Sequence, residues 1–140
     1  MDTSHAVFSL GHVLLKLRVS PEAVAADLQS RDAPVDERVI LHKVAKFWNQ
    51  TRRFDRPDGL LVVTTHRLAF LPKIMTITTT TEFLSFPYAD IKHLETTRVM
   101  RISPAVRFQV GEDPYVFTLW SGADQVVAAA RKASAEAAAG

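Results

Sequence analysis

Basic side chains concentrate around one polar segment of the sequence, residues 49–58. The basic residues in and just before it are Lys46, Arg52, Arg53 and Arg56. Guanidinium groups donate charge-assisted hydrogen bonds to phosphate oxygens, so this composition suits an anionic ligand. The alternative is a solvated turn without a ligand, because Asp55 and Asp58 offset part of the positive charge. The residues by themselves leave both interpretations open.

Histidine and serine residues form no recognisable catalytic or metal-binding pattern. The histidines are scattered along the chain, at His5, His12, His42, His66 and His93. No pair has the i, i+4 spacing with glutamate that a zinc-binding helix shows. Ser9, Ser85 and Ser121 lack the context of a nucleophile elbow. The chain has no cysteine, which excludes disulfides and thiolate metal sites. We therefore expect no enzymatic activity, no catalytic residue, no metal and no cofactor.

Length and charge favour one globular domain without a strongly charged partner. The chain has 140 residues, 47% of them hydrophobic, which is ordinary for a single domain. It has 17 Lys and Arg against 15 Asp and Glu, a net charge of +2. Arg98, Arg101 and Arg107 could extend a basic stripe, but acidic residues lie near them in the sequence. Binding to a nucleic acid backbone needs several basic contacts, so we expect none.

The sequence also predicts a cytoplasmic location. No run approaches the roughly 20 apolar residues that a membrane-spanning helix needs. The first residues do not resemble a secretory signal, since Asp2 stands where a positive charge is expected and Gly11-His12 interrupts the apolar stretch. The absence of cysteine fits a reducing compartment. Any membrane contact is expected to be peripheral.

Two helices are predicted before residue 36. Val7, Leu10, Leu14 and Leu17 recur at spacings of three and four, which places them on one face of a helix over residues 5–18. A second helix is expected from Pro21 to about Ser30, with Ser20 as its cap. The first helix could instead anchor the chain to a membrane, but the face opposite the leucines is poor in basic residues. Packing on the chain's own domain or on a second copy is the favoured interpretation.

Residues 36–140 predict a run of about seven short strands followed by one helix. A strand is preferred over residues 37–48, although a short helix over 39–47 also fits the spacing. Two apolar runs around Thr64-Thr65-His66 are typical of a hairpin over residues 59–71. Further strands are expected over 83–87, 94–102, 106–110 and 115–120. From Ala123 the chain is rich in strong helix formers.

Three segments resemble landmarks of GRAM domains and of bacterial pleckstrin-homology-like domains. In the stretch Gly59–Phe70 an apolar strand ends in Thr, a short turn follows, and Arg-Leu begins the next strand. In Phe86–Glu95 an apolar-Pro step precedes an Asp-Ile pair, and Tyr115–Phe117 precedes the helix from Ala123. The resemblance covers about residues 36–135. It implies a mainly β, α+β fold: a barrel of about seven antiparallel strands closed by a C-terminal helix.

The resemblance also implies a non-enzymatic binding module. Members of this fold bind lipids, peptides, other proteins or their own copies. We expect protein–protein interaction or self-assembly, and no small-molecule substrate. The alternative is a peripheral membrane adaptor that binds anionic headgroups. In that case the resemblance assigns the headgroup contacts to Lys46, Arg52, Arg53 and Arg56. Trp48, beside the polar segment, could then contact the membrane, because an indole is apolar with one polar end; the alternative is that Trp48 belongs to the core. Residues 1–35 depart from the family pattern and are expected to form a helical extension of the domain at 36–140.

Overall fold

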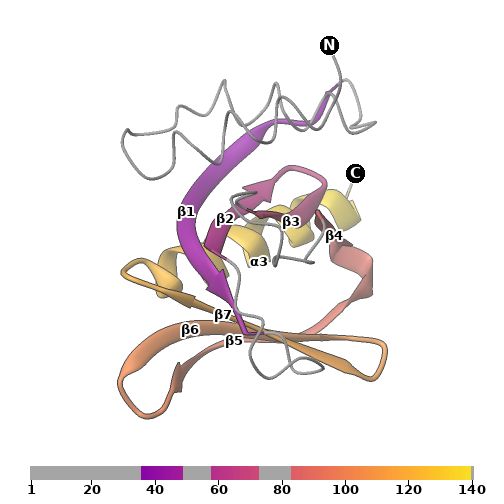
Figure 1. Ribbon diagram of the computed structural model, residues 1–140. Coiled ribbons are helices and arrows are strands. Elements are labelled where there is room, and N and C mark those ends of the chain that lie inside the picture. Colours follow the sequence, from indigo (N-terminus) through magenta and orange to yellow (C-terminus); the bar gives the residue numbers. More distant parts are fainter. Residues whose placement is uncertain (1–35, 49–57, 73–82, 140) are drawn as a thin grey trace.

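Seven antiparallel strands form one continuous sheet in the computed structural model, which describes residues 36–48, 58–72 and 83–139 (Figure 1). The order across the sheet is β4-β3-β2-β1-β7-β6-β5. The strands are β1 (Val39–Phe47), β2 (Asp58–Thr64), β3 (Arg67–Pro72), β4 (Leu84–Pro87), β5 (Ile91–Val99), β6 (Ser103–Val110) and β7 (Asp113–Leu119). A short 3-10 helix, η1 (Tyr88–Asp90), follows β4, and helix α3 (Ala123–Ala139) ends the described chain. The two helices predicted within residues 1–35 lie outside the described residues.

Strand β1 joins the two halves of the sheet, which are β2–β4 on one side and β5–β7 on the other. Along most of its length it pairs with β2, from Val39 opposite Thr64 to Lys46 opposite Asp58. Its last three residues pair on the other side with Phe117–Leu119 of β7. In Figure 1, β1 is a long curved strand that runs from the β2–β3 side to the β5–β7 side. The strand prediction for this segment is confirmed, and the alternative of a short helix over 39–47 is wrong.

The two halves of the sheet enclose an aromatic core. Phe117 of β7 lies at its centre, with ring centroids 5.0 Å from Phe47 and 5.2 Å from Phe70. The ring centroids of Phe86 and Phe108 lie 5.0 Å apart. Helix α3 contributes five buried side chains to the same core: Ala123, Val126, Val127, Ala130 and Ala133. The core therefore depends on residues from both halves of the sheet and from the helix.

The expectation of a closed barrel is wrong. Strands β4 and β5 are the two edges of the sheet, and no strand pairing between described residues joins them. Proline cannot donate to a ladder, and Pro87 ends β4 before η1 turns the chain away. Helix α3 contacts η1 and β5 on this side, and the Arg131 guanidinium donates to the Leu94 carbonyl at 2.8 Å. The C-terminal helix thus covers the core as expected, beside an open sheet.

Candidate functional site

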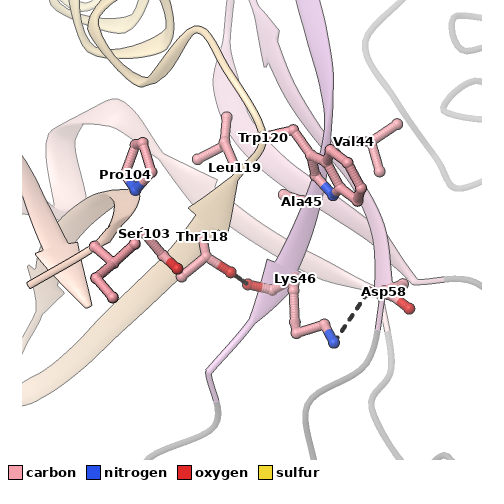
Figure 2. Close-up of a pocket in the computed structure, with 10 residues that line it drawn as sticks. Val44, Ala45, Lys46, Asp58, Ser103, Pro104, Thr118, Leu119 and Trp120 are labelled. Carbon is pink, nitrogen blue, oxygen red and sulfur yellow. Dashed lines mark hydrogen bonds and ion pairs between the residues drawn. The ribbon is translucent and has the colours of Figure 1, made fainter. Parts of the chain in front are cut away.

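A pocket of about 280 Å³ lies where β1, β2, β6 and β7 meet on the outside of the sheet (Figure 2). It is lined by Val44, Ala45, Lys46, Asp58, Ile102, Ser103, Pro104, Thr118, Leu119 and Trp120. Strand pairing brings these distant segments together, because Lys46 is opposite Thr118 and Lys46 is also opposite Asp58. The site therefore depends on the junction at which β1 holds β2 on one side and β7 on the other.

Three large apolar side chains at this pocket face solvent. Successive side chains of a strand point to opposite faces, so the buried Ala45 and Leu119 direct Val44 and Trp120 outward. Trp120 is 94% exposed, Ile102 77% and Val44 47%. We call Val44, Ile102 and Trp120 the Trp120 patch. Exposed tryptophan is costly to hydrate and is enriched among residues that dominate protein interfaces, so the patch is the clearest candidate for a binding surface.

The polar side of the pocket is formed by an exposed ion pair. The Lys46 Nζ lies 3.8 Å from the Asp58 Oδ1, and both side chains are about half exposed. The Thr118 hydroxyl lies 3.5 Å from the Lys46 carbonyl oxygen. Exposed ion pairs contribute little to stability, so Lys46 can exchange Asp58 for another carboxylate or a phosphate at low cost.

The structure describes two of the residues that the sequence suggested for headgroup or membrane contact. Lys46 lines the pocket. Trp48 is half-buried, and its indole N–H donates to the Thr118 hydroxyl at 2.9 Å, which places it beside β7. The other three, Arg52, Arg53 and Arg56, lie outside the described residues. Headgroup binding and membrane contact at these positions stay predictions.

The turn between β2 and β3 is built around the hydroxyl of Thr64. This oxygen accepts the backbone N–H groups of His66 and Arg67, each at 3.0 Å, and donates to the Glu37 carboxylate at 2.7 Å. Neither Thr65 nor His66 has a positive φ, so this turn does not need the glycine or asparagine of the usual two-residue hairpin, and the hydroxyl holds its backbone N–H groups instead. Arg67 in turn binds both oxygens of Glu37, through Nε at 2.9 Å and Nη2 at 3.0 Å. Sequence reasoning missed this network because its charged partners are far apart in the chain.

His66 lies between a hydroxyl and a carboxylate, as a catalytic histidine does, but the carboxylate is exposed to solvent. Its Nδ1 lies 2.8 Å from the Thr65 hydroxyl and its Nε2 lies 3.3 Å from the Asp36 carboxylate. Asp36 is 83% exposed, and the Thr65 hydroxyl also accepts the Arg38 backbone N–H. A hydroxyl held in a turn beside solvent-exposed groups lacks the enclosed, oriented geometry of a nucleophile. The arrangement stabilises the turn.

Two further observations bear on chemistry at this protein. Within the described ranges, no three His, Cys, Asp or Glu side chains converge in a way that could hold a metal ion. Burial raises the pKa of Tyr88, whose hydroxyl donates to the Thr64 carbonyl in the interior. Tyr88 is therefore a structural hydrogen-bond donor in the core.

Comparison with solved structures identifies the architecture. A pleckstrin-homology domain from Shewanella amazonensis SB2B shares 24% identity, with a TM-score of 0.51, over 86% of this chain and 100% of its own. A DUF1696 family protein with a pleckstrin-homology domain from Shewanella loihica PV-4 shares 21% identity, with a TM-score of 0.55, over 84% and 92%. The chain has a pleckstrin-homology-like fold. The finer resemblance to GRAM domains stays a prediction.

A third solved structure has a similar fold. The C-terminal domain of an unknown protein from Leishmania infantum shares 17% identity, with a TM-score of 0.57, over 70% of this chain and 84% of its own. No family model and no curated protein matches the sequence. Within the described ranges, no helix combines the length and hydropathy that crossing a bilayer requires. The comparisons thus establish the fold and leave the ligand to the geometry of the site.

Proposed function

We propose that this chain is a non-catalytic binding module whose Trp120 patch contacts another protein, in the first instance a second copy of the same chain. The observation that carries the proposal is the exposure of Trp120, at 94%, over a pocket of about 280 Å³. Apolar side chains grouped at a concave surface, beside a charged residue such as Lys46, are the composition of an interface centre with a polar rim. The pleckstrin-homology-like fold supports a binding role by analogy.

Sedimentation velocity over a range of protein concentrations tests this proposal. The unmodified chain should show a mass that rises with concentration, and Trp120→Ala should shift the rise to at least tenfold higher concentration. Interface tryptophans typically account for 2 kcal/mol or more of binding free energy, which corresponds to that shift. Glu112→Ala, in the exposed turn before β7, is the matched control and should leave the association unchanged. A chain that stays monomeric at every concentration contradicts self-association.

Peripheral binding to anionic lipid is the second candidate, supported by the exposed Lys46 beside the polar segment that carries Arg52, Arg53 and Arg56. Co-sedimentation with phosphatidylserine vesicles, against phosphatidylcholine vesicles, distinguishes it. Binding that needs the anionic lipid, persists at physiological salt and is lost when the three arginines become serine would favour the membrane adaptor. If Trp120→Ala abolishes self-association while the serine variant has no effect, the protein-binding proposal is supported.

A further inference from the structure

The outward face of the β2–β3 hairpin is apolar and buried, although it points away from the core. Leu61 and Val63 of β2 and Phe70 of β3 belong to the core cluster. Because side chains alternate along a strand, their neighbours face the other way. These neighbours, between 0 and 2% exposed, are Leu60, Val62, Ala69 and Leu71. We call these four residues the outer hairpin face.

Strand register makes the outer hairpin face a continuous surface. Leu60 is opposite Leu71, and Val62 is opposite Ala69. On β1, Val44 is opposite Leu60 and extends the apolar surface by one strand. Side chains paired across two strands lie about 5 Å apart, so the four residues form one patch without polar interruption.

No element among the described residues packs over this face. The described neighbours of the hairpin are β1 and β4 at its two edges and α3. The buried residues of α3, including Val126 and Ala130, belong to the core cluster on the inner side. A contiguous apolar surface that excludes water requires a cover. That cover must come from outside the described ranges.

The path of the chain at Glu37 indicates which segment supplies the cover. Thr64 continues the row of Leu60 and Val62, and Arg67 begins the row of Ala69 and Leu71, so both side chains lie on the outer side of the hairpin. Both bind the Glu37 carboxylate, which is 1% exposed. The chain is therefore fixed at one end of the outer hairpin face where it enters β1, directly after residue 35.

We propose that the N-terminal segment of the same chain, residues 1–35, lies across the outer hairpin face, with the leucine side of the helix predicted over residues 5–18 as its apolar cover. The leucine side carries Val7, Leu10, Leu14 and Leu17. A helix over that range is about 21 Å long, and the seven residues of β2 extend about 23 Å. The chain between Ser30 and Asp36 can span up to about 20 Å, enough to return the segment over the sheet.

Two other segments are less suited to this role. Residues 49–57 contain a single large apolar side chain, Phe54, among polar and charged ones. Residues 73–82 contain Ile74, Met75 and Ile77, followed by a run of threonines, without the spacing of one helix face. Only the N-terminal segment combines a repeated apolar stripe with attachment at the face. The outer hairpin face meets the Trp120 patch at Val44, but the inference rests on the burial of the hairpin residues and does not depend on the proposed function.

Disulfide mapping in the full chain tests the inference, because the protein has no cysteine of its own. Leu10→Cys and Leu14→Cys are each combined with Val62→Cys and oxidised at low protein concentration. At least one pair should give an intramolecular disulfide, detected as a faster, monomeric band on a non-reducing gel. Lys16→Cys with Val62→Cys is the matched control, since Lys16 lies on the opposite side of the predicted helix, and should give none.

Three outcomes would overturn the inference. A disulfide-linked dimer from the leucine pairs would assign the cover to a second copy. Cross-linking of Met75→Cys to Val62→Cys, with none from the leucine pairs, would assign it to residues 73–82. Equal cross-linking of the Lys16 and leucine pairs would show that no defined helix face binds.

A second measurement avoids any change in the hairpin itself, in case Val62→Cys fails to fold. Leu10→Asp with Leu14→Asp should lower amide hydrogen-exchange protection across β2 and β3 by at least tenfold, whereas Lys16→Asp should not. Unchanged protection in the leucine variant would contradict the proposed cover.

Discussion

Arg67 and Glu37 form a bidentate ion pair in which the side chains are 12% and 1% exposed. Removing one partner of a buried ion pair destabilises the fold far more than removing both, because it leaves a buried charge without a partner. Arg67→Met should therefore lower the free energy of unfolding by about 3–5 kcal/mol, measured by urea denaturation. The variant Glu37→Gln/Arg67→Met removes both charges and keeps an acceptor for the Thr64 hydroxyl. It should recover most of the loss, and a double variant as unstable as Arg67→Met would contradict this account.

His42 lies opposite Val62 on the outward side of β1. Burial, and secondarily the charge of Lys43, lower the pKa of His42 below its ordinary value of 6.5. The unfolded chain then binds a proton more readily than the folded chain, so stability falls as the pH drops below 6.5. His42→Gln should flatten this part of the pH–stability curve, measured by thermal unfolding. His93→Asn, at an exposed histidine, is the matched control; an equal effect of both variants would implicate other groups.

At the scale of single elements, the hairpin β2–β3 requires a glycine at position 59, because strand β3 leaves no room for a side chain there. A Cβ on Gly59 would lie 2.2 Å from the Leu71 carbonyl oxygen and 2.9 Å from the Phe70 ring. The backbone carbonyl group of Leu71 cannot move aside as the end of a flexible side chain can. Gly59→Ala should therefore cost at least about 1–3 kcal/mol, the range for overpacked sites.

Gly111 provides the comparison for this prediction. It has a φ of +61° with open space around it, so Gly111→Ala should cost only the roughly 1–2 kcal/mol of a left-handed residue with a side chain. Equilibrium denaturation of the two variants separates steric clash from backbone strain. If Gly59→Ala is the less destabilising of the two, the close approach does not limit the hairpin.

The order of elements from β1 to α3 followed from the sequence because it depends on local patterns. Period-two alternation identified β6 and β7, and helix formers identified α3. Local patterns could not predict that β4 and β5 stay unpaired as the two edges of an open sheet, because this depends on where α3 packs. One signal of the candidate site was present: Trp120 alternates with Phe117 and Leu119, so a buried Phe117 directs Trp120 outward. Ile102 and Val44 join it only through strand register, which residues far apart in sequence determine.

At the scale of the whole molecule, one aromatic cluster joins both halves of the sheet. Phe117 of β7 contacts Phe47 and Phe70 on one side and Phe108 on the other. Phe117→Ala should therefore cost about 3–5 kcal/mol, as is usual for a buried phenylalanine. Unfolding, followed by tryptophan fluorescence and circular dichroism, should remain a single transition with coincident midpoints. Separate midpoints for the two probes would show that the halves unfold independently.

The pairing of β1 with β7 has a consequence for how the protein forms during its synthesis. Ala45–Phe47 receive their second neighbour only from Phe117–Leu119, so the early half of the sheet is made long before its partner leaves the ribosome. The hairpin of β2 and β3 can form locally, but its core side chains stay exposed until β7 and α3 arrive. Such long-range pairing slows folding and leaves apolar strands open to aggregation. A nascent chain that stops short of β7 should therefore aggregate more readily than the full-length chain.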